Sequence, residues 1–307
     1  MNAVMIQTFL AILETFIIFA IGAWLTKRKV LDEQGISQLS NLTLDILFPL
    51  MTIGSITRNF KSSDLADLWI LPVAGFGMMA AGMFMGMFLC KFMRNRTKPR
   101  MAMFQHYCTS NNYLFLPLIV LDNLWGDRYV SLLLVMSLGG SIGFWTLGIA
   151  SFGGNSMRET IRNIFSVNLY AVLLALALVL FDIPLPGVLS KVCNTMGNAA
   201  VPLVLIGIGA AIYKSAQGMW SNLFDVFYLS AVRLMILPLI FIFILKLLPV
   251  PEDIFRVLVV TALMPVSSSS VLVARRYGGD MELASQAIVI STVLSIFTAP
   301  LMLMIIL

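Results

Sequence analysis

Residues 41–54 read NLTLDILFPLMTIG, and residues 194–207 read NTMGNAAVPLVLIG. Both segments begin with an asparagine, continue eight residues later with Pro-Leu, and end with Ile-Gly. The offset between the two copies is 153 residues at every matching position. Self-similarity at a fixed offset is the signature of an internal repeat. The matched asparagine and proline positions are Asn41 with Asn194 and Pro49 with Pro202.

A second pair of matches lies in the same register. Gly126-Asp127 and Gly279-Asp280 are also 153 residues apart. Helix ends in general favour Pro-Leu and Gly-Asp pairs, which is the alternative explanation, but two separated matches at one offset favour a repeat. The predicted units are residues 1–152 and residues 153–307.

The composition excludes a soluble globular domain. The chain is 59% hydrophobic and 11% charged, whereas soluble domains are about 45–50% apolar and about 25% charged. A helix of about 20 apolar residues crosses a bilayer, and lipid permits only helices or closed barrels, whose strands would alternate with period two. That alternation is absent, so we predict an all-α integral membrane protein. Its ten predicted spans are residues 4–26, 37–56, 69–93, 101–121, 129–152, 164–182, 194–213, 224–248, 254–274 and 283–306.

The positive charges at the connections predict the orientation. Thirteen Lys and Arg residues lie at odd-numbered connections and six at even-numbered ones, so the odd connections are expected in the cytoplasm. Both termini are then extracytoplasmic, in a multi-pass protein of the plasma (inner) membrane. Nothing basic precedes Lys27, so the first apolar stretch is a transmembrane helix and not a signal peptide. The net charge of +5 reflects loop placement and not affinity for nucleic acid.

The offset assigns five helices to each unit, because it maps span 2 onto span 7 and span 5 onto span 10. Since five is odd, the second unit enters the membrane inverted relative to the first. Inverted five-helix repeats are typical of secondary transporters, whose two halves form a site near the bilayer midplane that opens alternately to the two sides.

Spans 4 and 9 are paired by the repeat, and both carry polar interruptions. Proline breaks the backbone ladder, and Asn and Ser side chains can satisfy the freed groups. Two crossing broken helices would direct half-helix N-termini at one point suited to an anion. The alternative is that these side chains join helices and Pro265 makes a kink. The candidate substrate-binding residues are Asn111, Asn112, Tyr113, Pro117, Pro265, Ser267, Ser268, Ser269 and Ser270, with either Asn111 or Asn112 as the crossover asparagine.

Ionisable residues inside spans are functional candidates by default. Arg233 in span 8 either binds an anionic substrate or pairs with Glu14 or Asp45. Asp45 lies four residues before a proline, on the same helical face, and either carries a coupling H+ or Na+ or forms a structural salt bridge. Glu14 is a weaker candidate for the same role. His106, the only histidine, is compatible with a neutral hydrogen-bonded residue and is left outside the site.

The search for enzyme motifs is empty. Walker, dinucleotide-binding, zinc-protease and hydrolase signatures are absent, so neither an ATP-driven pump nor an enzyme is predicted, and no cofactor or metal is expected.

The chain resembles the auxin efflux carrier family of secondary transporters along nearly its whole length. The motifs that carry the resemblance are residues 21–25 (IGAWL) before a basic loop, 47–50 (LFPL), 111–118 (NNYLFLPL), 233–239 (RLMILPL), 264–265 (MP), 277–280 (YGGD) and 298–300 (TAP). Three features depart from the family pattern: Phe115 replaces the usual glycine two residues before the span 4 proline, the asparagine-to-proline spacing is one residue short if Asn111 is the counterpart, and serines stand where plant members have an asparagine in helix 9.

The resemblance implies a fold similar to that of sodium/proton antiporters and bile-acid symporters, with crossed helices 4 and 9. Helices 1, 2, 6 and 7 would be a scaffold, and helices 3–5 and 8–10 a moving transport domain. The expected function is secondary active or facilitative transport of a small organic anion, such as malonate, malate or an auxin-like acid, by an elevator-type movement. The alternatives are a sodium-coupled carrier of the bile-acid type, or a channel or receptor without transport. The same resemblance implies a homodimer whose two subunits contact each other through the scaffold helices.

Overall fold

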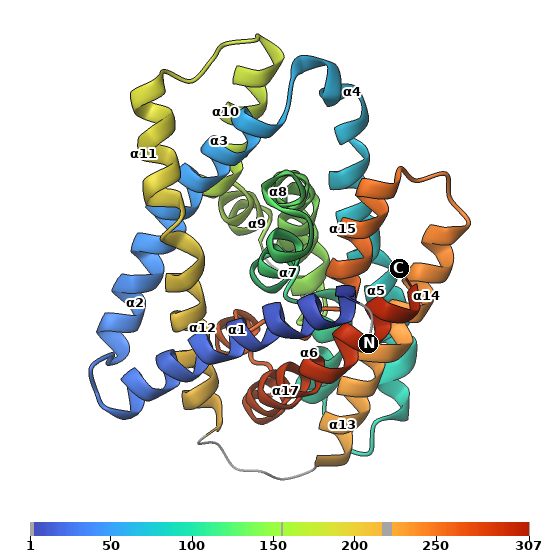
Figure 1. Ribbon diagram of the computed structural model, residues 1–307. Helices are drawn as coiled ribbons and strands as arrows, with labels where there is room; N and C mark the ends of the chain where they lie inside the picture. Colours follow the sequence, from blue (N-terminus) through green and yellow to red (C-terminus); the bar gives the residue numbers. More distant parts are fainter. Residues whose placement is uncertain (1–2, 155, 217–222, 307) are drawn as a thin grey trace.

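The computed structural model describes residues 3–154, 156–216 and 223–306, and within these ranges the regular elements are all helices (Figure 1). The first half contains α1 (Ala3–Lys27), α2 (Glu33–Leu42), α3 (Phe48–Asn59), α4 (Leu65–Leu68), α5 (Ile70–Leu89), α6 (Lys98–Thr109), α7 (Phe115–Trp125) and α8 (Asp127–Gly143). The second half contains α9 (Met157–Ile164), α10 (Val167–Leu180), α11 (Gly187–Gly197), α12 (Ala200–Ala216), α13 (Leu223–Ala231), α14 (Leu237–Lys246), α15 (Glu252–Ala262), α16 (Ser270–Tyr277) and α17 (Met281–Ile306).

Several helical runs are long and apolar enough to cross a membrane. In the described residues there are six, and α9 with α10 forms a seventh candidate that is bent by 54°. Large apolar side chains such as Phe84 and Phe243 are exposed on the outside, as expected where lipid and not water covers the surface. The chain is therefore an all-α membrane protein. The six runs are Glu33–Asn59, Ser62–Phe92, Asp127–Gly148, Gly187–Lys214, Leu223–Lys246 and Met281–Ile306.

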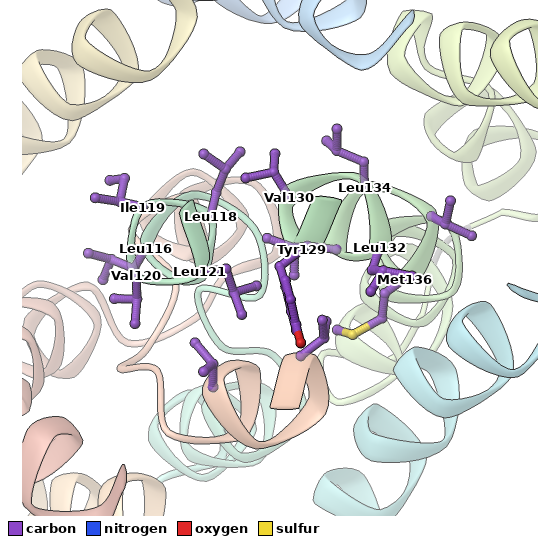
Figure 2. Close-up of a cluster of buried hydrophobic side chains, with 14 of the residues drawn as sticks. Leu116, Leu118, Ile119, Val120, Leu121, Tyr129, Val130, Leu132, Leu134 and Met136 are labelled. Atoms are coloured by element: carbon purple, nitrogen blue, oxygen red, sulfur yellow. The ribbon is translucent and has the colours of Figure 1, made fainter. Parts of the chain in front are cut away.

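The centre of the helix assembly is formed by α7 and α8 (Figure 1). In the apolar part of the Asp127–Gly148 run 67% is buried, against 28% in that of Ser62–Phe92. Leucine and valine side chains of α7 and α8 form part of the largest apolar cluster (Figure 2). The ring of Tyr129 points from α8 towards α15, where its hydroxyl donates to Asp253 Oδ1 at 2.6 Å. The central helices are thus held to a later element by both packing and a hydrogen bond.

Two glycines allow α1 and α12 to cross closely. A Cβ atom added to Gly22 would lie 2.1 Å from the carbonyl oxygen of Ile206, and one added to Gly209 would lie 2.1 Å from that of Phe19. Neither distance is possible for a side-chain carbon, so both positions require glycine. Small residues at membrane helix contacts let backbones approach in this way.

Three helices contain a five-residue π-helical segment, at Thr43–Leu47, Phe144–Gly148 and Val232–Ile236. A π-helical segment forms i→i+5 bonds, so a spacing of four residues no longer keeps two side chains on one face. This corrects the prediction that Asp45 shares a face with Pro49: Asp45 is exposed and Pro49 is buried.

Candidate functional site

The helices of predicted spans 4 and 9 are interrupted, and the two interruptions meet. α6 ends at Thr109 and α7 begins at Phe115, while α15 ends at Ala262 and α16 begins at Ser270. Between them Asn111 and Val266 form an isolated antiparallel bridge, and the backbone N–H of Asn112 donates to the carbonyl oxygen of Pro265 at 2.9 Å. This contact, which we call the crossover, brings four half-helix ends together.

The side chains of both asparagines bind these helix ends. Asn111 Nδ2 donates to the carbonyl oxygen of Thr261, in the last turn of α15, at 2.5 Å. Asn112 Oδ1 accepts from the backbone N–H of Phe115 at 3.2 Å and so caps the start of α7. The helix-joining interpretation therefore describes both side chains, and of the two it is the side chain of Asn111 that reaches the opposite chain segment.

The serine run turns through the start of α16 and does not present one face. Ser267 and Ser270 are buried, Ser268 is half-buried and Ser269 is exposed. The hydroxyl of Ser270 contacts His106 Nε2 at 2.8 Å. Only the two buried serines therefore face the inside of the molecule.

Arg233 reaches the crossover from the π-helical segment Val232–Ile236. Its Nε donates to the carbonyl oxygen of Met264 at 3.2 Å, and its Nη2 donates to that of Ala262 at 3.0 Å. The guanidinium thus covers the C-terminal end of α15, where the helix dipole is negative. The proposed ion pair with Glu14 or Asp45 is wrong, because these carbonyl oxygens and not either carboxylate bind the guanidinium.

The charge on Arg233 is buried, because the residue is 1% exposed. Within the described ranges no carboxylate forms an ion pair with it, and its recorded partners are backbone carbonyls. Carbonyl dipoles at a helix end correspond to about half an elementary charge. The crossover therefore carries an incompletely balanced positive charge.

A small cavity adjoins this charge. Its volume is about 10 Å³, roughly the room needed for one water molecule. The wall combines one guanidinium and a few neutral polar groups with glycine, methionine and aromatic residues. The lining residues are Gly75, Met78, Met79, Thr109, Asn111, Tyr113, Met136, Gly140, Arg233, Phe241 and Thr261.

A wider cavity of about 330 Å³ lies between α3, α7, α8 and the α11–α12 turn. Arg58 projects into it, donating from Nη2 to Asp127 Oδ2 at 2.7 Å and from Nη1 to Asn194 Oδ1 at 2.5 Å. Glu14 and Asp122 also line the cavity. Sequence reasoning assigned no role to Arg58 or Asp122, although the repeated Gly-Asp pair was a signal for Asp127.

A narrow apolar gap adjoins this cavity. Leu118 and Val201 line the cavity and also surround a narrow apolar gap beside Phe48 and Phe115. The rings of Phe48 and Phe115 meet edge to face at 5.7 Å between centroids. Phe115 is the first residue of α7 and follows the crossover segment, so this aromatic contact joins α3 to the start of α7.

The remaining predicted site residues lie elsewhere. Asn41, Asp45 and Pro202 are exposed, and Pro117 is buried inside α7. None of these residues, nor Glu14, Pro49 or Asn194, lines the small cavity. The structure thus brings together Asn111, Asn112, Tyr113, Pro265, Arg233 and the buried serines. Over the described residues there is no group of three or more His, Cys, Asp or Glu side chains that could hold a metal ion.

Comparison with known proteins gives consistent results. The model of the membrane transport protein family matches residues 7–168 and 158–303. A protein of Methanothermobacter thermautotrophicus described as an uncharacterized transporter is 25% identical over 94% of this chain and 95% of its own length. A second uncharacterized transporter, from Methanocaldococcus jannaschii, is 22% identical over 93% of this chain and 94% of its own length.

Proposed function

The chain belongs to the membrane transport protein family, that of the auxin efflux carriers, and from this premise we propose that it is a secondary transporter of a small organic anion. The substrate is a mono- or dicarboxylate, such as malonate, malate or an auxin-like acid. It binds at the crossover and is moved across the plasma membrane by alternating access.

One observation carries this proposal: the buried guanidinium of Arg233 beside the small cavity has backbone carbonyls as its recorded partners. A buried charge is costly unless it is paired. A substrate carboxylate is the group that matches a guanidinium best, since it accepts two parallel hydrogen bonds. The cavity of about 10 Å³ has to widen as the proposed moving parts shift before it admits an organic acid, and its methionine and aromatic lining then suits the apolar part of that acid.

The proposed architecture has ten spans in two inverted five-helix halves, with spans 4 and 9 crossing at the site. Predicted spans 1, 2, 6 and 7 form a scaffold, and predicted spans 3–5 with 8–10 move against it in an elevator-type step. The crossover supports this arrangement, because it joins the two broken helices that the 153-residue offset pairs. With the termini extracytoplasmic, the wider cavity around Arg58 opens to the outside.

Transport is tested by counterflow in proteoliposomes, with labelled malonate, malate and indole-3-acetate as probes. A carrier accumulates label when the same unlabelled acid is inside, whereas a channel does not. We expect Arg233→Ala to abolish counterflow and Arg233→Lys to retain part of it, because only the lysine keeps a positive charge at the site.

The matched control is Arg276→Met, since Arg276 is half exposed and pairs with Glu159 at 3.2 Å away from the crossover. Normal counterflow in Arg233→Ala would contradict the proposed site. Loss of Arg233→Ala from the membrane would instead show that the guanidinium is needed for folding. A strict sodium requirement with every probe would favour the bile-acid type of carrier.

A further inference from the structure

A buried polar cluster lies one helical turn before the crossover. His106, on α6, is 0% exposed. Its Nδ1 lies 2.8 Å from the carbonyl oxygen of Gly148, and its Nε2 lies 2.8 Å from the hydroxyl oxygen of Ser270. The ring thus joins three separate elements: α6, the π-helical segment Phe144–Gly148 and the first residue of α16.

The partners define the protonation of the ring. A carbonyl oxygen only accepts, so Nδ1 carries a hydrogen and donates to Gly148. Nε2 then accepts from the Ser270 hydroxyl, and the imidazole is neutral. The lone pair of Nε2 is the one position in this ring where a further proton can bind.

A second hydroxyl in the cluster has no partner. Ser110 Oγ is fully buried and forms no hydrogen bond to any described residue. A Cβ atom added to Gly148 would lie 2.8 Å from Ser110 Oγ and 3.4 Å from His106 Nδ1, so the serine and the histidine approach the same glycine. A buried unpaired hydroxyl is costly, and it can bind a water molecule or a proton donor that reaches the cluster.

The cluster is close to the proposed anion site. Thr109 and Asn111 line the small cavity, and three residues of α-helix, from His106 to Thr109, rise only about 4.5 Å. Ser270 opens the half-helix that follows the crossover. A charge on the imidazole would therefore act directly on a carboxylate bound beside Arg233.

The charged groups around the His106 imidazole determine when a proton can bind to the ring. No carboxylate contacts the imidazole in the described part of the chain; its recorded contacts are Gly148, Ser270 and the rings of Tyr107, Phe144 and Phe152. Asp225 and Asp280 are bound by Arg100. The titratable and charged residues of α6 and of the elements packed against it are Cys90, Lys91, Lys98, Arg100, Tyr107, Cys108, Asp225, Tyr228, Arg233, Arg275, Arg276, Tyr277 and Glu282.

Arg233 makes the region positive before any proton is bound. A second positive charge on His106 would be repelled by the guanidinium and penalised by burial. A substrate carboxylate between them reverses both effects, because it attracts each cation. The proton and the anion therefore favour one another's binding, which is thermodynamic linkage.

We propose that His106 is the proton-coupling site of this transporter, binding one proton together with each substrate carboxylate. This inference rests on the proposed function, since it requires an anion at the crossover. The proton comes from water, forms an N–H bond with the Nε2 lone pair, and returns to water when the carboxylate leaves. On protonation Nε2 becomes a donor to Ser270 Oγ, whose own hydrogen turns away from the ring.

The single histidine makes a direct measurement possible. In protein purified without a histidine tag and labelled only at histidine, the imidazole nitrogen resonances belong to His106 alone. Without substrate we expect a neutral ring at neutral pH. With saturating malonate or indole-3-acetate, whichever gives counterflow, the titration midpoint should rise by about one to two pH units, as expected for opposite charges several ångströms apart in a medium of low polarity.

Transport gives the second readout. An imposed pH gradient should drive accumulation of the same acid by the wild type and by Tyr107→Phe. The latter is the matched control, because Tyr107 is buried on the same helix but its hydroxyl donates to Ala284, at 2.9 Å. His106→Gln should keep counterflow and lose at least about tenfold of the gradient-driven accumulation.

The outcomes separate the two proposals. If no probe shows counterflow with the wild type, the proposed function fails, and this inference fails with it. If counterflow is normal but the imidazole titrates at the same pH with and without the acid, only the proton site is overturned. A His106→Gln protein that is absent from the membrane leaves the resonance measurement on the wild type to decide.

Discussion

The Gly-Asp pairs at residues 126–127 and 279–280 each lie at a corner of the chain where a helix begins, and we call them the open corner and the buried corner. They have the same sequence, but the arginine bound at the open corner is half exposed and the one at the buried corner is buried. Asp127 is the first residue of α8, and Asp280 directly precedes α17, where its Oδ1 accepts from the backbone N–H of Leu283 at 2.8 Å. A carboxylate at a helix N-terminus is stabilised by the helix dipole, so the local role is shared. The difference lies in which arginine each carboxylate meets.

At the open corner, Asp127 forms an ion pair with Arg58 that is partly exposed. In its pair with Arg58 the side chains are 38% and 48% exposed. Ser55 and Asn59, both on α3, also donate to the same carboxylate. This corner therefore joins predicted span 5 to predicted span 2 at the edge of the wider cavity.

Asp280 meets an arginine that is buried. Arg100 is 1% exposed and binds Asp280 at 3.2 Å and Asp225 at 3.1 Å. Asp225 also accepts from the backbone N–H groups of Arg94 and Asn95, at 2.8 Å and 3.2 Å. This corner ties together the elements of predicted spans 4, 8 and 10. The same Gly-Asp motif thus forms a half-exposed ion pair between the proposed scaffold and transport parts, and a buried one within the proposed transport part.

The largest expected effect is on the buried corner. Arg100→Met leaves two carboxylates without their arginine, and removing one partner of a buried pair costs about 3–5 kcal/mol. We expect a large fall in the midpoint of thermal unfolding in detergent. Arg96→Met is the matched control, because Arg96 lies in the same connection and, among the residues that the structure describes, donates to the carbonyl oxygen of Met93, at 3.0 Å, and forms no ion pair. Similar midpoints for the two variants would remove the contrast between the corners.

The buried corner also shows where sequence reasoning stops. The helix interruptions were predictable, because Asn, Ser and Pro act on the backbone of their own helix. The partners of Arg100 lie 125 and 180 residues away, so only the packing of distant helices brings them together. In the sequence Arg100 counted solely as a positive charge at a connection.

In the candidate site, too, one part could be predicted from the sequence and another part could not. The meeting of Asn111 with the residues after Pro265 was predicted from the 153-residue offset, which pairs these two segments. The acceptor that each amide uses was not predictable: Asn112 binds its own helix start, whereas Asn111 reaches a carbonyl 150 residues away. Whether an Asn side chain binds backbone or substrate depends on its three-dimensional distance to each acceptor. The spacing of residues along the chain does not give this distance.

The second prediction concerns the open corner. Arg58→Met should change the free energy of unfolding by no more than about 1 kcal/mol, because exposed ion pairs contribute little. Its rate of counterflow should change severalfold, since the pair joins parts that move against each other in the proposed mechanism. Counterflow rates are measured beside Arg128→Met, whose pair with Asp253 is similarly exposed at 3.9 Å. A strongly destabilised Arg58→Met protein would mean that the two corners are equivalent.

The smallest expected effect is the difference between the two corners in how strongly salt weakens their ion pairs. A double-mutant cycle with Arg58→Met and Asp127→Asn should give a coupling energy of about 0.2–1 kcal/mol at low ionic strength. Raising the salt from about 0.1 M to about 1 M shortens the screening length from about 10 Å to about 3 Å, so this coupling should nearly vanish. The corresponding cycle for Arg100 and Asp225 should stay unchanged, because their side chains are buried. Equal salt sensitivity in both cycles would contradict the assigned difference in burial.

The π-helical segment Thr43–Leu47 has a consequence for the ancestry of the chain. It lies between Asn41 and Pro49, and the stretch 153 residues later also departs from a continuous α-helix, since α11 ends at Gly197 and α12 begins at Ala200. A codon gained by one copy alone would have changed the offset, yet it is 153 residues on both sides of the segment. If the halves descend from one duplicated gene segment, the irregularity in this helix was inherited by both and is older than the duplication.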